Sequence, residues 1–136
     1  MARILVIDDD RQMRSLIRQV LERDGHEVAE AENGVEGLAA FAEQPADLAV
    51  VDLYMPGKGG WETIRALEEA KPGLPFILVS GGAVLEGLRK GSAGTLDSIR
   101  PLAAFRVLRK PFGLSALSAA AEELLRAGTV LGAGDP

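Results

Sequence analysis

The sequence predicts an α/β fold: a doubly wound, mostly parallel sheet of five strands with helices on both faces. Short apolar runs alternate along the chain with longer amphipathic stretches, which is the pattern of repeating strand–helix units. The strongest runs, such as residues 4–7, are continuously apolar, as expected of parallel strands that are buried on both faces. The chain has 136 residues and a hydrophobic content of 47%, enough to bury one core. We therefore expect one folded domain.

The first strand–helix unit is defined by a buried strand over residues 4–7 and a helix capped by Asp10. Gly25 stands where that helix should end. A weaker strand follows over residues 26–31, in which Val28 is the only large apolar residue, so we predict a strand at the edge of the sheet. The apolar side chains expected to face the core from the helix follow the 3.6-residue period: Met13, Leu16, Ile17, Val20 and Leu21.

The middle of the chain repeats this pattern. Asn33 followed by Glu36 is a capping box, which opens a helix that runs through Phe41 towards Pro45. A second buried strand is predicted over residues 48–51.

The remaining elements are a helix that ends before Pro72, strands over residues 76–79 and 105–108, and a final helix. The first of these helices carries Ile64 and Leu67, and the last carries Leu114, Leu117, Leu124 and Leu125. Residues 128–136 are predicted to form a flexible C-terminal tail.

Composition excludes several functional classes. The formal net charge is −5, with 20 acidic and 15 scattered basic residues, which argues against direct binding to nucleic acid. The absence of cysteine excludes disulfides and thiolate metal sites. No apolar run approaches the ~18 residues of a membrane span. We expect a cytoplasmic protein without a membrane anchor.

Polar side chains follow each of the four strong strands, at the point where the strand ends. They are Asp8 with its two acidic neighbours, Asp52, Ser80 and Lys110. Ligands of doubly wound sheets bind at the carboxyl ends of the strands, so we expect these groups to converge. Each one also has a simpler explanation: a helix cap for the acidic run, a solvated strand end for Lys110 and a turn for Ser80. Asp52 has none, because it ends an apolar strand and precedes no obvious helix.

Carboxylates that converge at one edge would repel one another, and each would raise the pKa of the others. A cation offsets that repulsion, and Mg²⁺ prefers one or two carboxylates together with water and phosphate oxygens. A lysine adds a compact positive charge that can pair with a carboxylate or a phosphoryl oxygen.

Four segments together resemble the receiver domain of bacterial response regulators. They are ILVIDDD at 4–10, LAVVDLYMPGKGG at 48–60, FILVSGG at 76–82 and VLRKPF at 107–112. The resemblance extends from about residue 2 to residue 126. It implies a flavodoxin-like strand order of 2-1-3-4-5, with a receiver domain over residues 1–127.

The resemblance also implies a role for each of the polar residues that follow the strands. Asp52 corresponds to the phosphoacceptor, Ser80 to the hydroxyl that moves onto the phosphoryl group, and Lys110 to the lysine of the site, in a cis bond with Pro111. The implied Mg²⁺ ligands are Asp8, Asp9, Asp52 and the backbone carbonyl of Tyr54. The implied partner is a histidine kinase or a histidine phosphotransfer protein. We expect a single-domain receiver that signals by phosphorylation-dependent partner binding or relay, and that catalyses only its own phosphorylation and dephosphorylation.

Among the departures from the family pattern, two concern the last strand and the region before it. Val107 stands where the family usually has an aromatic residue, and Phe105, two residues earlier, should lie on the same strand face. Lys110 follows Ser80 by 30 positions, longer than is typical, and the glycine-rich region 81–101 contains the excess.

Two alternatives stay open. A receiver-like interaction module would work without phosphorylation. A phosphatase of the haloacid dehalogenase type would use Asp8 as its nucleophile, because Asp8-x-Asp10 after a buried strand resembles that family's start, although Gln12 departs from its pattern.

Overall fold

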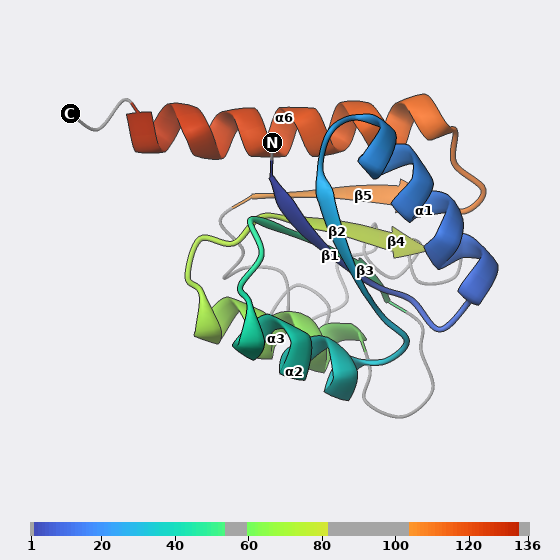
Figure 1. Ribbon diagram of the computed structural model, residues 1–136, viewed down its shortest axis with the longest axis horizontal. Helices are drawn as coiled ribbons and strands as arrows, with labels where there is room; N and C mark the ends of the chain where they lie inside the picture. The colour runs from blue at the N-terminus through green and yellow to red at the C-terminus, as the bar shows by residue number, and fades with distance from the viewer. Residues whose placement is uncertain (1, 54–59, 82–103, 134–136) are drawn as a thin grey trace, which may run out of the picture.

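The computed structural model describes residues 2–53, 60–81 and 104–133, with the side chains of the last helix described as far as residue 126. Five strands form one sheet in the order β2-β1-β3-β4-β5, and every neighbouring pair is parallel (Figure 1). The strands are β1 (Arg3–Ile7), β2 (Glu27–Ala31), β3 (Leu48–Asp52), β4 (Phe76–Ser80) and β5 (Phe105–Arg109). The predicted fold class and strand order are confirmed.

Among the described residues, two helices cover each face of the sheet. Figure 1 shows α1 and α6 above the strands and α2 and α3 below them. Their bounds are α1 (Arg11–Arg23), α2 (Gly34–Glu43), α3 (Gly60–Ala70) and α6 (Leu114–Ala133). Since side chains alternate along a strand, successive residues of β1 enter opposite cores. Ile4 and Val6 pack with α1 and α6, whereas Leu5 and Ile7 pack with α2 and α3.

The helix starts follow the capping chemistry that the sequence predicts. The Asp10 carboxylate accepts hydrogen bonds from the backbone N–H groups of Gln12 and Met13. Asn33 accepts from the Glu36 N–H at 2.8 Å, and the Glu36 carboxylate accepts from the N–H of Glu32. Asp10 and Asn33 thus satisfy N–H donors of the first helical turn, and Glu36 bonds the chain just before the N-cap.

The end of α1 also agrees with the prediction, because Gly25 takes a φ of +96° that residues with a Cβ rarely adopt. The predicted core of this helix needs one correction. Ile17, Val20 and Leu21 are buried, but Leu16 is 39% exposed. Positions 16 and 17 differ by about 100° around the helix axis, so only one of them can point directly at the sheet.

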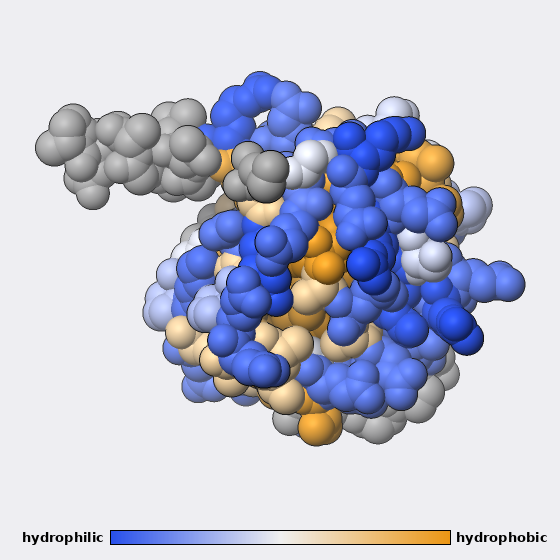
Figure 2. Space-filling view, viewed as in Figure 1, coloured by the Kyte–Doolittle hydropathy of each residue, from blue (hydrophilic) through white to orange (hydrophobic). Residues whose placement is uncertain are grey.

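β2 lies at the edge of the sheet, as its single large apolar residue predicts. Ion pairs flank it: Arg3 with Glu27 and Arg14 with Glu30. The face that carries β2 is mainly hydrophilic, with apolar residues gathered near its centre (Figure 2). Charged side chains of this kind discourage a second chain from pairing with an exposed strand.

The last helix differs from the prediction. The helical backbone of α6 continues to Ala133, whereas the sequence predicts a tail from Gly128. A glycine costs about 1 kcal/mol relative to alanine within a helix. Gly128 alone therefore does not end α6. None of the described helices has the length and apolar character that a membrane crossing requires.

Candidate functional site

The polar residues that follow the strong strands lie side by side along the rim of the sheet that the carboxyl ends of the strands form. The register pairs Ile7 with Val51, Asp52 with Val79 and Ser80 with Arg109. The carboxyl ends of β1, β3, β4 and β5 therefore reach the same edge. The backbone N–H of Lys110 donates to the Ser80 carbonyl at 2.8 Å, which fixes the residue after β5 against the end of β4.

The side chain of Lys110 joins the two buried carboxylates. Its Nζ atom lies 3.2 Å from Oδ2 of Asp52 and 3.8 Å from Oδ2 of Asp8. The Asp52 side chain is 4% exposed and that of Asp8 is 2% exposed, whereas Lys110 is 29% exposed. A buried carboxylate with a cation beside it stays ionised more readily than one without.

Asp8 is held by several hydrogen bonds but has one oxygen left over. Its backbone N–H donates to the Ala31 carbonyl at 3.1 Å, and its Oδ1 atom accepts from the Asp10 N–H at 2.8 Å. Oδ2 is buried and has no hydrogen-bond partner among the described residues. An unsatisfied buried carboxylate oxygen is costly, so this atom is suited to a ligand that supplies positive charge.

The electrostatics reflect this crowding of charges. Burial, together with the charge of the neighbouring Asp52, raises the pKa of Asp8 to about 6. The hydrogen bond from the Asp10 N–H and the charge of Lys110 act in the opposite direction. Burial lowers the pKa of Lys110, but the Asp8 and Asp52 carboxylates outweigh it, so that this pKa is raised above its ordinary value. The Lys110 ammonium therefore pairs with both carboxylates, and one positive charge does not balance the negative charge of the cluster.

Three of the predicted metal ligands lie together. Carboxylate oxygens of Asp8, Asp9 and Asp52 all lie within 4.8 Å of one another. Asp9 is exposed, and the other two are buried. Oxygen donors of this kind suit Mg²⁺, and Oδ2 of Asp8, which has no hydrogen-bond partner among the described residues, is available to a cation. The cluster could hold a metal ion. Tyr54, the fourth predicted ligand, lies outside the described residues.

Ser80 is fully buried at the end of β4, and its backbone carbonyl accepts a hydrogen bond from the Lys110 N–H. Its hydroxyl donates to the carbonyl of Gly81 at 3.0 Å. The structure thus places Ser80 at the predicted edge and gives its hydroxyl a neighbouring carbonyl as partner.

Two further expectations about β5 and its end are met. The bond between Lys110 and Pro111 is cis. Phe105 and Val107 both pack against the core that α2 and α3 cover, so they lie on one strand face as predicted. The glycine-rich region 81–101 lies outside the described residues from residue 82 onward.

Sequence reasoning missed one residue of the site, Arg14. Its Nη1 atom donates to the backbone carbonyl of Asp8 at 2.8 Å, and its Nε atom donates to Glu30 at 3.1 Å. An arginine on a surface helix is an ordinary solvated residue in the sequence. Only the packing of α1 beside β2 reveals the contact.

The matching family model is that of the response regulator receiver domain, and it covers residues 4–122. The chain therefore belongs to the response regulator receiver domain family, whose members act in two-component signalling. Response regulators receive phosphate from histidine kinases.

Relatives agree with this assignment. The transcriptional regulatory protein ResD of Bacillus subtilis (strain 168) is 39% identical over 97 residues, which cover 71% of this chain and 40% of ResD. The response regulator MprA of Mycobacterium sp. (strain KMS) is 37% identical over 125 residues, which cover 91% of this chain and 50% of MprA. The chain thus spans half the length, or less, of these two curated relatives.

A solved structure matches over nearly its full length. The crystal structure of a response regulator receiver domain protein from Clostridium thermocellum has a TM-score of 0.80 and 30% sequence identity. The match covers 96% of this chain and 99% of that one.

Proposed function

We propose that this receiver accepts a phosphoryl group on Asp52 from a histidine kinase or a histidine phosphotransfer protein. The observation that carries the proposal is the contact of Lys110 with Asp52 at 3.2 Å, beside a buried oxygen of Asp8 that accepts no hydrogen bond from the described residues. A nucleophilic carboxylate, a fixed cation and a further acidic oxygen for a metal ion are the parts that phosphoryl transfer to an aspartate requires.

The chemistry assigned to Asp52 is nucleophilic attack. One carboxylate oxygen forms a bond to phosphorus as the bond from phosphorus to the donor atom breaks, and the donor leaves with the electron pair. The donor is a phosphohistidine or a small acyl phosphate. The Lys110 ammonium neutralises negative charge that builds up on the phosphoryl oxygens. Attack of water on phosphorus later returns Asp52 to its carboxylate and releases phosphate.

We assign the metal site to Asp8, Asp9 and Asp52, with the backbone carbonyl of Tyr54 as a fourth ligand. These residues would hold Mg²⁺, which would supply positive charge to offset that of the carboxylates and the phosphoryl oxygens. The support is the convergence of three carboxylates and the chemical fit of their oxygens to this ion.

The signalling step assigned to Ser80 is a change of the hydrogen-bond acceptor of its hydroxyl. Its hydroxyl, which donates to Gly81, would donate to a phosphoryl oxygen once Asp52 is modified. A shift of this kind biases the packing of the neighbouring strand ends, and so changes which partner the receiver binds or relays to. We propose that the chain acts in the cytoplasm as a signalling protein, with no chemistry beyond its own phosphorylation and dephosphorylation.

The test is intact mass after incubation with a small acyl phosphate, with and without Mg²⁺. We expect the wild-type chain to gain one phosphoryl group only with Mg²⁺, and Asp52→Asn to gain none. Arg18→Gln, which changes surface ion pairs with Glu22 and Glu30 and no described contact of Lys110, is the matched control and should be modified like wild type. Equal modification of Asp52→Asn and wild type would overturn the proposal.

A further inference from the structure

We propose that Arg14 is a positioning residue, which fixes Asp8 in the geometry that binds the divalent cation. The inference rests on the proposed function, because it concerns the same metal site. It assigns a role to a side chain that touches neither the cation ligand atoms nor Asp52 in any described contact.

The first step concerns how Asp8 is held. Its backbone N–H, its backbone carbonyl and its Oδ1 atom each have a hydrogen-bond partner, from β2, from α1 and from the turn between β1 and α1. Only Oδ2 has none among the described residues, and it is the atom that faces Lys110 at 3.8 Å. The three hydrogen bonds therefore fix which oxygen of Asp8 is presented to a cation.

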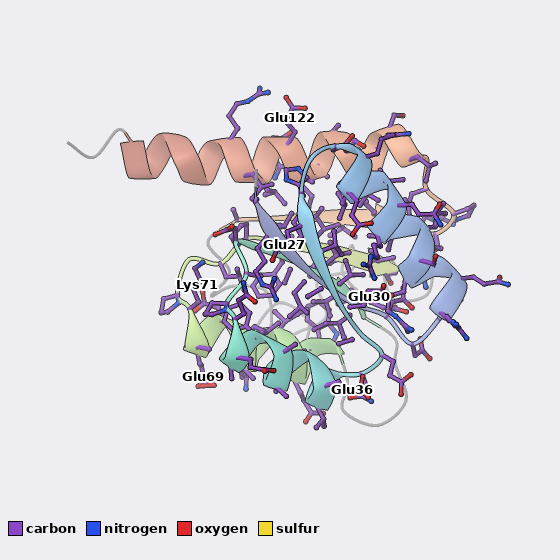
Figure 3. The ribbon with its side chains drawn as sticks, viewed as in Figure 1. Glu27, Glu30, Glu36, Glu69, Lys71 and Glu122 are labelled. Carbon is purple, nitrogen blue, oxygen red and sulfur yellow. The ribbon has the colours of Figure 1, made fainter. Side chains whose placement is uncertain are left out.

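The second step concerns how Arg14 is held. One side of its guanidinium donates to the Asp8 carbonyl at 2.8 Å and the other donates to Oε1 of Glu30 at 3.1 Å. The Arg14 side chain is 13% exposed, so this pair is shielded from solvent. Figure 3 shows Glu30 on β2, beside α1. The planar fork of arginine suits two donations in fixed directions, which a lysine ammonium does not reproduce.

The third step identifies the neighbour that serves as a control. Arg18 stands one turn further along α1 and donates to the other carboxylate oxygen of Glu30 at 2.6 Å. It also pairs with Glu22 and is 46% exposed. Arg14 and Arg18 thus carry the same charge and share Glu30, but of the two only Arg14 has a described contact with Asp8.

Positioning and simple electrostatics predict opposite results for the loss of Arg14. Removal of a positive charge near an acidic cluster should strengthen Mg²⁺ binding. Loss of the donor to the Asp8 carbonyl should weaken it, because the turn must then be ordered when the cation binds. Changes to groups that orient metal ligands commonly cost 10- to 100-fold in metal affinity.

The experiment is a Mg²⁺ titration of the full chain followed by the backbone amide signals of Asp8 and Asp52 in nuclear magnetic resonance spectra. The variants are Arg14→Gln, Arg14→Lys and Arg18→Gln, and urea unfolding of each measures global stability. We expect Arg14→Gln to weaken Mg²⁺ binding by about 10-fold, Arg14→Lys to fall between it and wild type, and Arg18→Gln to stay within about twofold of wild type.

Three results would overturn the inference. Unchanged Mg²⁺ binding by Arg14→Gln would show that Arg14 does not position Asp8, and tighter binding would show that only its charge acts on the site. Equal weakening in Arg14→Gln and Arg18→Gln, in proportion to lost stability, would reduce Arg14 to a structural ion pair. Absence of Mg²⁺ binding by the wild-type chain would overturn the proposed metal site as well, and so is distinguishable from the first two.

Discussion

Asp8 and Asp52 are both buried carboxylates, but their surroundings suit them to different tasks. Asp52 lies against Lys110 at 3.2 Å. Asp8 is tied through its backbone and through Oδ1, and its Oδ2 lies 3.8 Å from Lys110 without a hydrogen bond from the described residues. The first arrangement favours a nucleophile beside a cation, and the second favours a metal ligand.

The raised pKa of Asp8 predicts that this residue costs stability at neutral pH in the absence of divalent cations. The folded-state pKa is about 6, above the ordinary value of 3.8. Stability linked to Asp8 is therefore fully present below pH 3.8 and is lost as the pH rises through 6. We expect Asp8→Asn to be more stable than wild type at pH 7.5 by on the order of 1 to 3 kcal/mol.

Urea unfolding in the presence of a chelator checks this at pH 4 and pH 7.5. The difference between Asp8→Asn and wild type should be much smaller at pH 4, because Asp8 is then protonated and uncharged in the folded state. A variant that is less stable than wild type at pH 7.5 would contradict the assignment of an unfavourable buried charge.

The residues that follow the strands could be predicted from the sequence, because the carboxyl ends of parallel strands share an edge. Asp52, Ser80 and Lys110 lie where that rule places them. The contact of Arg14 with the Asp8 carbonyl could not be predicted, because it depends on the position of α1 beside β2. Likewise, no sequence pattern indicates that the Ser80 hydroxyl donates to Gly81.

At the scale of elements, the start of α3 packs directly against the end of β3. A Cβ atom on Gly60 would lie 2.7 Å from the Asp52 carbonyl oxygen and 2.7 Å from the Cα atom of Leu53. Both are backbone atoms and cannot yield without a shift of the strand that carries the proposed phosphoacceptor.

We therefore expect Gly60→Ala to destabilise the fold by about 1 to 3 kcal/mol and to slow phosphorylation. Gly81→Ala is the matched control, because a Cβ atom there meets nothing within 4 Å. Urea unfolding compares the two variants. If Gly60→Ala and Gly81→Ala are equally stable, the close approach of α3 to β3 does not constrain the site.

The elements themselves were largely predictable from apolar periodicity and capping residues. β1, β3 and β4 are buried along nearly their whole length, whereas the residues of β5 are half-buried or exposed. Asp10 and Asn33 cap helices as expected. The end of α6 was not predictable from Gly128, because the penalty of a single glycine is small against the hydrogen bonds of a continuing helix.

At the scale of the whole molecule, two cores on opposite faces of one sheet support a single edge that carries the site. A ligand that binds the folded chain alone must stabilise the entire domain. We expect Mg²⁺ at ten times its dissociation constant to raise the free energy of unfolding of wild type by about 1.4 kcal/mol.

Trp61, half-buried on α3 and packed against the core beside it, reports this unfolding by fluorescence. The increase in the free energy of unfolding with Mg²⁺ should be lost in Asp8→Asn. NaCl at the same ionic strength, without a divalent cation, should not reproduce it. Equal stabilisation of wild type and Asp8→Asn by Mg²⁺ would place the cation elsewhere.

The most direct test of the central claim is to map the phosphorylated residue. After modification with a small acyl phosphate and Mg²⁺, borohydride reduction converts a phosphorylated aspartate to homoserine, which peptide mass spectrometry locates in the sequence. We predict homoserine at position 52 alone. Homoserine at position 8, as a phosphatase of the haloacid dehalogenase type would give, would contradict the assignment of Asp52 as the phosphoacceptor.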